Sequence, residues 1–236
     1  MRSLLGVFAA TTLALGAAPS LSAQDTPAEP KFTLAVIETE AAKGQADAIA
    51  TLGWMYETGK GGAATDTARA VSLYRTAVAQ GDAFGQWRLG VMIDEGKTAG
   101  SHAEAIALFR QAAAQKSPGA MASLGVMHAT GRGVERDYEA AMRYYQAAAR
   151  MGSAHGLEGI GVLYANGQGV ARDMDEALAH WLAAAAAGDE DAMKLLMQYM
   201  PASGDPAAAP IYARANVIAD AYGIAEGETA RTAGIR

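Results

Sequence analysis

Residues 120–152 read AMASLGVMHATGRGVERDYEAAMRYYQAAARMG, and variants of this stretch lie before and after it in the chain. One marker of the stretch is a glycine preceded by Leu or Ile, which recurs 37, 35 and 36 residues apart at Gly53, Gly90, Gly125 and Gly161. A second marker is the break after each alanine-rich segment, with spacings of 37, 35, 36 and 36, at Gly44, Gly81, Lys116, Gly152 and Gly188. Because both markers share the same irregular spacing, the sequence predicts a tandem repeat of about 36 residues.

Each repeat is predicted to hold two helices joined by a glycine-rich turn, as at 120–130 and 138–151. The second helix of each unit follows a residue whose side chain can accept hydrogen bonds from the free amides of the first turn. These capping residues are Asp66, Ser101, Asp137 and Asp173. A recurrent glycine inside the first helix predicts that its backbone contacts a neighbouring helix, where a Cβ would clash.

The repeat pattern divides the chain into units. We predict a capping helix at 31–44, four repeats at 45–81, 82–116, 117–152 and 153–188, and a degenerate repeat or cap at 189–224. In that last unit Pro210 is expected at the first position of a helix, which tolerates proline.

The two ends of the chain are predicted to lie outside the repeats. Residues 1–23 have the pattern of a secretory signal peptide, with Arg2, an apolar run and a small residue at Ala23. A retained membrane anchor is the alternative, although the apolar run is shorter than a membrane span. Because of the signal peptide, the protein is expected to be exported and periplasmic. Residues 24–30 are interpreted as a flexible lead-in and 225–236 as a C-terminal tail.

The composition narrows the classes of function. With 51% hydrophobic but only 7% aromatic residues and abundant alanine, the chain favours closely packed helices. The absence of cysteine excludes disulfides, a lipoprotein anchor, thiolate zinc sites and a cysteine nucleophile. A net charge of −6 argues against nucleic acid or an anionic membrane as the partner.

The sequence predicts no catalytic, cofactor-binding or metal-binding residues. His102, His128, His155 and His180 have no metal-ligand spacing. His128 occupies a repeat position held elsewhere by tyrosine, so we interpret it as a half-buried ring. Ser153 and His155 have no orienting acid nearby in sequence. The acids at 189–191 are interpreted as stabilising the N-terminus of the following helix, in preference to a paired-carboxylate or calcium site.

Two tryptophans occupy places that the repeat does not require. Trp87 aligns with Ala50, Ala122 and Glu158, and Trp54 aligns with Val91 and with valines in the next two repeats. Helical spacing places Trp87 with Val91, and Ala50 with Trp54, on one stripe across two repeats. These residues either contact a partner or fill space between units, and both interpretations remain open. The candidate partner-binding residues are Trp54, Trp87, Val91 and Glu158.

The repeat resembles the Sel1-like repeat, a relative of the tetratricopeptide repeat. The matching residues are Leu124-Gly125, Gly131-Arg132-Gly133-Val134, Asp137, Ala141, Tyr144-Tyr145, Ala148-Ala149 and Gly152, followed by Ile160-Gly161, Tyr164, Gly167-Gln168-Gly169-Val170, Asp173, Ala177, Trp181 and Gly188. The resemblance implies an all-α, right-handed α/α solenoid whose concave face binds proteins. Exported members similar to this chain include a periplasmic inhibitor of a sensor kinase and a cysteine-rich set reported to bind β-lactams, from which this chain departs by having no cysteine.

The expected function is therefore a non-enzymatic scaffold that binds a protein or peptide along the first helices of its repeats and modulates an envelope signalling component. A hydrolase acting on cell-wall material or β-lactams is the alternative, and a purely structural role in the envelope is a third. The sequence does not determine the partner, the pathway or the oligomeric state.

Overall fold

The computed structural model describes residues 33–202 and 205–224, which form eleven α-helices and one short 3-10 helix. The predicted signal peptide at 1–23, lead-in at 24–30 and tail at 225–236 lie outside the described residues. The helices are α1 (Leu34–Ala42), α2 (Ala46–Thr58), η1 (Lys60–Gly62), α3 (Thr67–Ala79), α4 (Ala83–Asp94), α5 (His102–Ala114), α6 (Pro118–Thr130), α7 (Tyr138–Arg150), α8 (Ala154–Asn166), α9 (Met174–Ala186), α10 (Glu190–Tyr199) and α11 (Ala208–Tyr222). Within these ranges none of the helices is long and apolar enough to cross a membrane.

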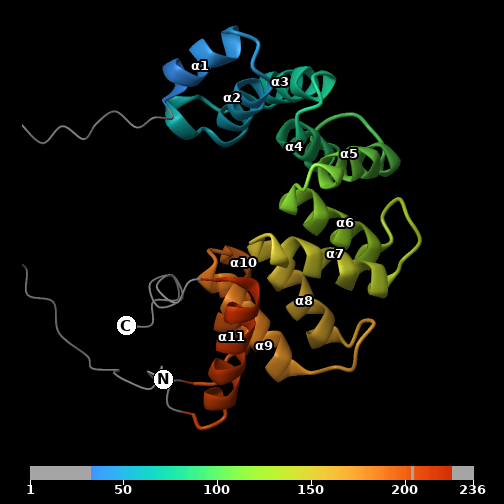
Figure 1. Cartoon of the computed structure of the whole chain (residues 1–236), viewed down its shortest axis with the longest axis vertical. Helices are drawn as coiled ribbons and strands as arrows, with labels where there is room; N and C mark the ends of the chain where they lie inside the picture. Colours follow the sequence, from blue (N-terminus) through green and yellow to red (C-terminus); the bar gives the residue numbers. More distant parts are fainter. Residues whose placement is uncertain (1–32, 203–204, 225–236) are drawn as a thin grey trace, which may run out of the picture.

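The helices are arranged as consecutive pairs. We call α2, α4, α6 and α8 the A helices, and their partners α3, α5, α7 and α9 the B helices. Each A helix packs against its B helix, and each B helix packs against the first helix of the next unit. Figure 1 shows the pairs following one another along an arc from α1 to α11. This arrangement confirms the predicted all-α solenoid of helix pairs.

The predicted capping residues start the B helices. The side chains of Asp66, Ser101, Asp137 and Asp173 each accept a hydrogen bond from the backbone amide three residues on, at 2.8–3.2 Å. The same chemistry starts the helices that follow four of the five breaks, where the caps are Asp82, Ser117, Ser153 and Asp189, whereas Gln45 after Gly44 makes no such bond. Ser117 places the start of α6 two residues before the predicted position, with Pro118 in the first turn.

The breaks between units depend on a left-handed backbone. Gly44, Gly81, Gly152 and Gly188 have φ between 81° and 91°. Lys116 takes the equivalent place with φ of 65°, and it is the one residue other than glycine with positive φ in the described part of the chain. Since an L side chain is disfavoured in this region, Lys116 stands where a glycine would be less strained.

The glycines inside the A helices lie against the paired B helix, as predicted, and the nearest atoms there belong to aromatic rings. A Cβ on Gly90 would lie 2.5 Å from the ring of Phe109, and one on Gly161 would lie 2.4 Å from that of Trp181. Gly53 and Gly125 face Tyr74 and Tyr145 in the same way. The missing side chain therefore makes room for the large residue of the B helix, which the core needs because its other residues are mostly small.

The last two described helices close the C-terminal end of the arc. The helix α11 packs against α9, and its residue Ile211 is almost fully buried. The prediction that Pro210 is the first helical residue is wrong, because α11 begins at Ala208. Pro210 still lies in the first turn, where its missing amide has no partner within the helix.

The buried apolar residues form two large clusters. One extends from α1 to α6 and the other from α7 to α11. Half-buried residues of α6 also pack on the second cluster, and Tyr144 of α7 packs on the first. The core is therefore extended along the solenoid, as expected when each unit contacts mainly its neighbours.

Candidate functional site

The A helices share one face that is open to solvent in the same register. On α4 this face carries Phe84, Trp87, Arg88 and Val91, because residues three, four and seven apart lie on one side of a helix. We call the A-face the half-buried or exposed residues at these positions: Asp47, Thr51, Trp54, Phe84, Trp87, Arg88, Val91, Gly119, Ser123, Val126, His155, Glu158 and Val162. Since neighbouring A helices are in contact, the A-face is one continuous surface. It includes all four predicted partner-binding residues.

An apolar strip runs along the A-face. It consists of Trp54, Val91, Val126 and Val162, which occupy one repeat position, and each of them is half-buried against the core. The ammonium group of Lys60 lies 5.0 Å from the centre of the Trp54 ring. Ala50, which the sequence placed on the same stripe, has no exposed surface. The strip therefore begins at Trp54.

Trp87 joins two repeats. Its indole nitrogen donates a hydrogen bond to the hydroxyl of Ser123 on α6, at 3.1 Å. A Cβ on Gly119 would lie 2.5 Å from the same ring, so the glycine leaves room for it. Trp87 thus fills space between units, one of the two roles considered for it, while its half-buried ring also remains part of the A-face.

The repeat position of Trp87 explains why Glu158 stands out. The alanines at this position, Ala50 and Ala122, are at most 5% exposed, because the position lies at the contact between neighbouring units. The larger side chains of Trp87 and Glu158 are not enclosed by this contact, and both are half-buried.

A buried ion pair links the first two repeats. Arg88 on α4 donates two hydrogen bonds to the carboxylate of Glu57 on α2, and the hydroxyl of Tyr74 donates a third at 2.7 Å. The side chains of Arg88 and Glu57 are only 16% and 9% exposed. Although burial opposes it, the Glu57 carboxylate raises the pKa of Arg88, and burial together with Glu57 raises the pKa of Tyr74. This cluster joins two repeats through a buried pair of opposite charges at one end of the A-face.

A different polar cluster lies at the other end of the A-face. The ring nitrogen Nδ1 of His155 lies 2.5 Å from the carboxylate of Asp189, whose side chain is fully buried. Asp189 also caps α10 by accepting the amides of Asp191 and Ala192. Glu158, one turn after His155 on α8, completes this cluster. The sequence offered no acid near His155, and the structure corrects this by supplying one 34 residues away.

Burial and neighbouring charges set the protonation of this cluster. Burial, aided by the charge of Asp189, raises the pKa of Glu158 to about 7. The hydrogen bond with Asp189 raises the pKa of His155. Although burial opposes it, the bonds from His155 and from the amide of Ala192 hold the pKa of Asp189 below its usual range. The cluster therefore gains or loses protons near neutral pH.

Ser153 does not complete a catalytic triad with His155 and Asp189. Its hydroxyl accepts the amide of Gly156, as a helix cap. The acids at 189–191 follow the predicted capping role, since Asp189 is the N-cap of α10. Within the described ranges no group of three or more His, Cys, Asp or Glu residues could hold a metal ion.

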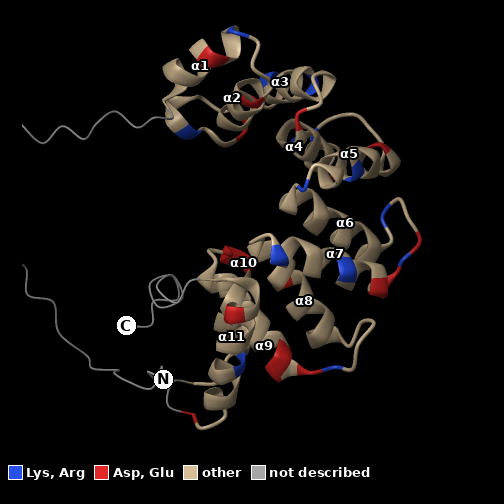
Figure 2. Ribbon diagram, viewed as in Figure 1, with Lys and Arg blue, Asp and Glu red and all other residues tan. Residues whose placement is uncertain are grey.

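The other histidines have structural partners. His128 is half-buried and stacks on Tyr144, with ring centres 5.4 Å apart, which agrees with its predicted place in a tyrosine position. His102 pairs with Asp94 at 3.2 Å. Figure 2 shows acidic and basic residues interspersed along the arc.

The Sel1 repeat family model matches four consecutive segments of the chain, residues 46–82, 83–117, 118–153 and 154–189. Comparison with curated proteins gives no match.

Several solved structures are similar to this one. A protective antigen present in uropathogenic Escherichia coli strains, described as having an SLR fold, is 25% identical with a TM-score of 0.64, and the match covers 86% of this chain but only 43% of that protein. A Sel1 repeat protein from Oxalobacter formigenes is 25% identical with a TM-score of 0.60, covering 86% of this chain and 91% of that one. An immunity protein from Pseudomonas aeruginosa shares the fold at 20% identity and a TM-score of 0.56, covering 91% of this chain and 86% of that one.

Proposed function

The chain belongs to the Sel1 repeat family, whose members are generally non-catalytic protein-interaction scaffolds, and on this premise we propose that it binds a protein or peptide on the A-face. The observation that carries the proposal is the apolar strip of Trp54, Val91, Val126 and Val162. Four neighbouring helices present apolar side chains at one repeat position, and each side chain keeps part of its surface in water. Covering this strip would stabilise a complex by removing that surface from water.

The flanking residues suggest how the partner is oriented. Trp54 has a large ring with a neighbouring cation, and tryptophan is over-represented among the residues that dominate binding energies. At the α8 end, the carboxyl of Glu158 is half-buried and has an acidic neighbour, so a basic group of the partner would stabilise its charged form. An extended segment with apolar side chains and one basic residue near α8 matches this surface.

We further propose that the protein acts in the periplasm and regulates a signalling component of the cell envelope. Support for export comes from the sequence of residues 1–23. The expected result is a mature protein that begins at Gln24 in the periplasmic fraction of cells expressing a C-terminally tagged chain. Retention of the tagged protein in the cytoplasm with an uncut N-terminus would refute this part of the proposal.

The A-face is tested by comparing variants in the capture of a partner from periplasmic extract. A Trp54→Ala/Val91→Lys variant should lose the partner that the unchanged protein retains. Matched controls are Val36→Lys and Met197→Lys, because these residues are 43% and 85% exposed and lie outside the A-face. Trp87 stays unchanged in this test because it packs between repeats. Circular dichroism checks that each variant is folded, and equal capture by all four proteins would exclude the A-face as the binding surface.

A further inference from the structure

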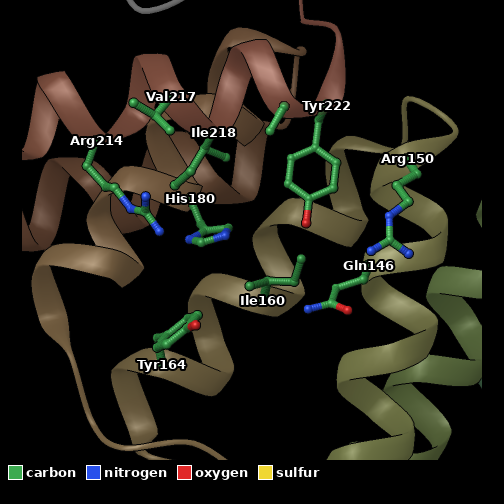
Figure 3. Close-up of a pocket in the computed structure, with 10 residues that line it drawn as sticks. Gln146, Arg150, Ile160, Tyr164, His180, Arg214, Val217, Ile218 and Tyr222 are labelled. Carbon is green, nitrogen blue, oxygen red and sulfur yellow. The ribbon is translucent and has the colours of Figure 1, made fainter.

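A pocket of about 420 Å³ lies between α7, α8, α9 and α11, away from the A-face. Figure 3 shows its side chains. The lining residues are Gln146, Arg150, Ile160, Tyr164, His180, Arg214, Val217, Ile218, Ala221 and Tyr222. None of them belongs to the A-face, so the pocket needs an explanation of its own.

The repeat architecture and the last helix together form this pocket. Gln146, Tyr164 and His180 each lie 36 residues after Arg110, His128 and Tyr144, which line a more open depression of about 470 Å³ one repeat earlier. The stacked pair of rings is present in both, as His128 on Tyr144 and Tyr164 on His180. The difference is α11, which packs on α9 and adds a further wall. The depression that is open in the preceding repeat is therefore more enclosed here, where α11 covers one side.

On one wall of the pocket, His180 and Arg214 both already have partners in Glu176. The Nδ1 atom of His180 lies 2.9 Å from the carbonyl oxygen of Glu176. Because a carbonyl only accepts, Nδ1 carries the proton and Nε2 is an acceptor. Burial lowers the pKa of His180, so the ring stays neutral. Arg214 binds the Glu176 carboxylate at 2.6 Å, and its charge is therefore balanced.

The opposite wall has an unbalanced positive charge. Arg150 has no ion-pair partner among the described residues. Figure 3 shows the Tyr222 hydroxyl pointing into the pocket on the side where Arg150 and Gln146 lie. Burial raises the pKa of Tyr222 while the charge of Arg150 opposes the rise, so the hydroxyl remains protonated and can donate. Among the described lining residues together with Glu176, the two guanidinium groups of Arg150 and Arg214 face one carboxylate, which leaves one excess positive charge.

The apolar part of the pocket lies beside these donors. Ile160 and Ile218 are 1% and 4% exposed, and Val217 at the rim is 56% exposed. We propose that the pocket binds a carboxylate attached to an apolar group, with the carboxylate held by Arg150 and the Tyr222 hydroxyl and the apolar group packed on Ile160 and Ile218. Guanidinium and hydroxyl donors match a carboxylate, and a single negative charge balances the excess. The carboxylate can come from the C-terminal residue of a peptide or from a free hydrophobic acid.

The proposal is tested by titrating the full chain with pairs of ligands that differ only in charge. N-acetyl-leucine should bind with a dissociation constant on the order of 1 mM, measured by calorimetry or NMR. Its uncharged counterpart N-acetyl-leucinamide should bind about tenfold more weakly, because the charged hydrogen bonds are lost. A tetra-alanyl-leucine peptide with a free C-terminus is then compared with its amide. Tighter binding of the peptide acid than of N-acetyl-leucine identifies a peptide terminus as the source, and equal or weaker binding identifies a free acid.

Two exposed residues allow the pocket to be altered without affecting the core. Arg150→Gln should weaken the binding of N-acetyl-leucine about tenfold, whereas Arg75→Gln, on an exposed part of α3, should leave it unchanged. Val217→Glu adds a negative charge at the rim and should also weaken binding. The proposal is overturned if acid and amide bind equally, if no ligand binds, or if neither pocket variant has an effect.

Discussion

The two ends of the A-face carry polar clusters of opposite character. At the α2–α4 end, one carboxylate, Glu57, is matched by one guanidinium, Arg88, and by the Tyr74 hydroxyl. At the α8–α10 end, two carboxyls, Glu158 and Asp189, share a single His155. Both clusters join an A helix to the next unit. In the first cluster Arg88 stays charged at any physiological pH, whereas in the second the pKa of Glu158 is raised to about 7.

The repeat sets the spacing of the helices in both clusters, whereas the individual residues set the charge of each cluster. The solenoid brings neighbouring A helices together at a regular interval, so side chains about one repeat apart meet at both ends, although at different repeat positions. Arginine stays charged under all ordinary conditions, so its cluster serves mainly to hold two repeats together. In the other cluster burial and the charge of Asp189 raise the pKa of Glu158 to about 7, so a partner or the pH can change the charge of this carboxyl.

The largest effect is expected from breaking the first cluster. Glu57→Gln should lower the free energy of unfolding by about 3 kcal/mol, because Arg88 is left buried without its counter-charge. Urea denaturation measures the loss. Glu139→Gln is the control, since Glu139 is 82% exposed and should change stability little. Equal stability of the two variants would show that the pairing of Glu57 with Arg88 does not stabilise the fold. The double variant Glu57→Gln/Arg88→Met should recover part of the loss, because no buried charge remains unpaired.

A smaller loss is expected when the second cluster is broken. Asp189→Ala removes a helix cap and the partner of His155, which should cost about 2 kcal/mol in unfolding free energy. Asp189→Asn keeps the cap and removes the charge. In that variant the pKa of His155, followed by NMR, should fall toward its usual value while α10 remains helical. An unchanged His155 pKa would show that Asp189 does not control this histidine.

The pH dependence of stability distinguishes the two ends further. The raised pKa values of Glu158 and His155 mean that the folded state binds more protons than the unfolded state. Their contribution is therefore complete below the unfolded pKa values and is lost as the pH rises through the folded ones. Between pH 5 and pH 8 this contribution should fall, whereas that of His180, whose pKa burial lowers, should rise. Glu158→Gln should remove a fall on the order of 1 kcal/mol, discounted for partial exposure. The Glu57→Gln variant should retain the same slope as the unchanged protein, and an unchanged slope in Glu158→Gln would contradict the assignment.

The smallest change in stability is expected at Lys116, in the break between α5 and α6. Lys116→Gly should raise the unfolding free energy by about 0.5–1 kcal/mol, because glycine adopts positive φ without steric cost. Lys43→Gly is the matched control, since Lys43 lies just before the break at Gly44 but has an ordinary φ of −79°. It should give no gain. A loss of stability in Lys116→Gly would show that the lysine side chain matters more than its backbone strain.

The sequence predicted the local structure well because the signals are local. Asp66 and Asp137 are followed within three residues by the amides that they cap, and Lys116 lies in register with four glycines. Asp82, Ser117 and Ser153, which cap the helices after three of the breaks, were missed although the same rule would have found them. Pro210 misled the prediction because proline is tolerated throughout the first turn, so it did not fix the first helical residue.

The polar clusters could not be predicted in the same way. Arg88 and Glu57 are 31 residues apart, and His155 and Asp189 are 34 apart, so neither pair forms a motif. A signal did exist, because residues nearly one repeat apart lie on neighbouring helices. Whether two such side chains meet depends on their lengths and directions, which the spacing does not contain.

By itself the sequence determined the period, the helix pairs and most of their boundaries, because caps, breaks and glycines act over a few residues. Only the tertiary structure decided that the pKa of Glu158 is raised to about 7, that Trp87 packs between repeats, and that α11 covers a pocket beside Arg150. These properties come from side chains that are far apart in the chain. Burial and charge at such contacts depend on how neighbouring units pack, which the repeat pattern does not encode.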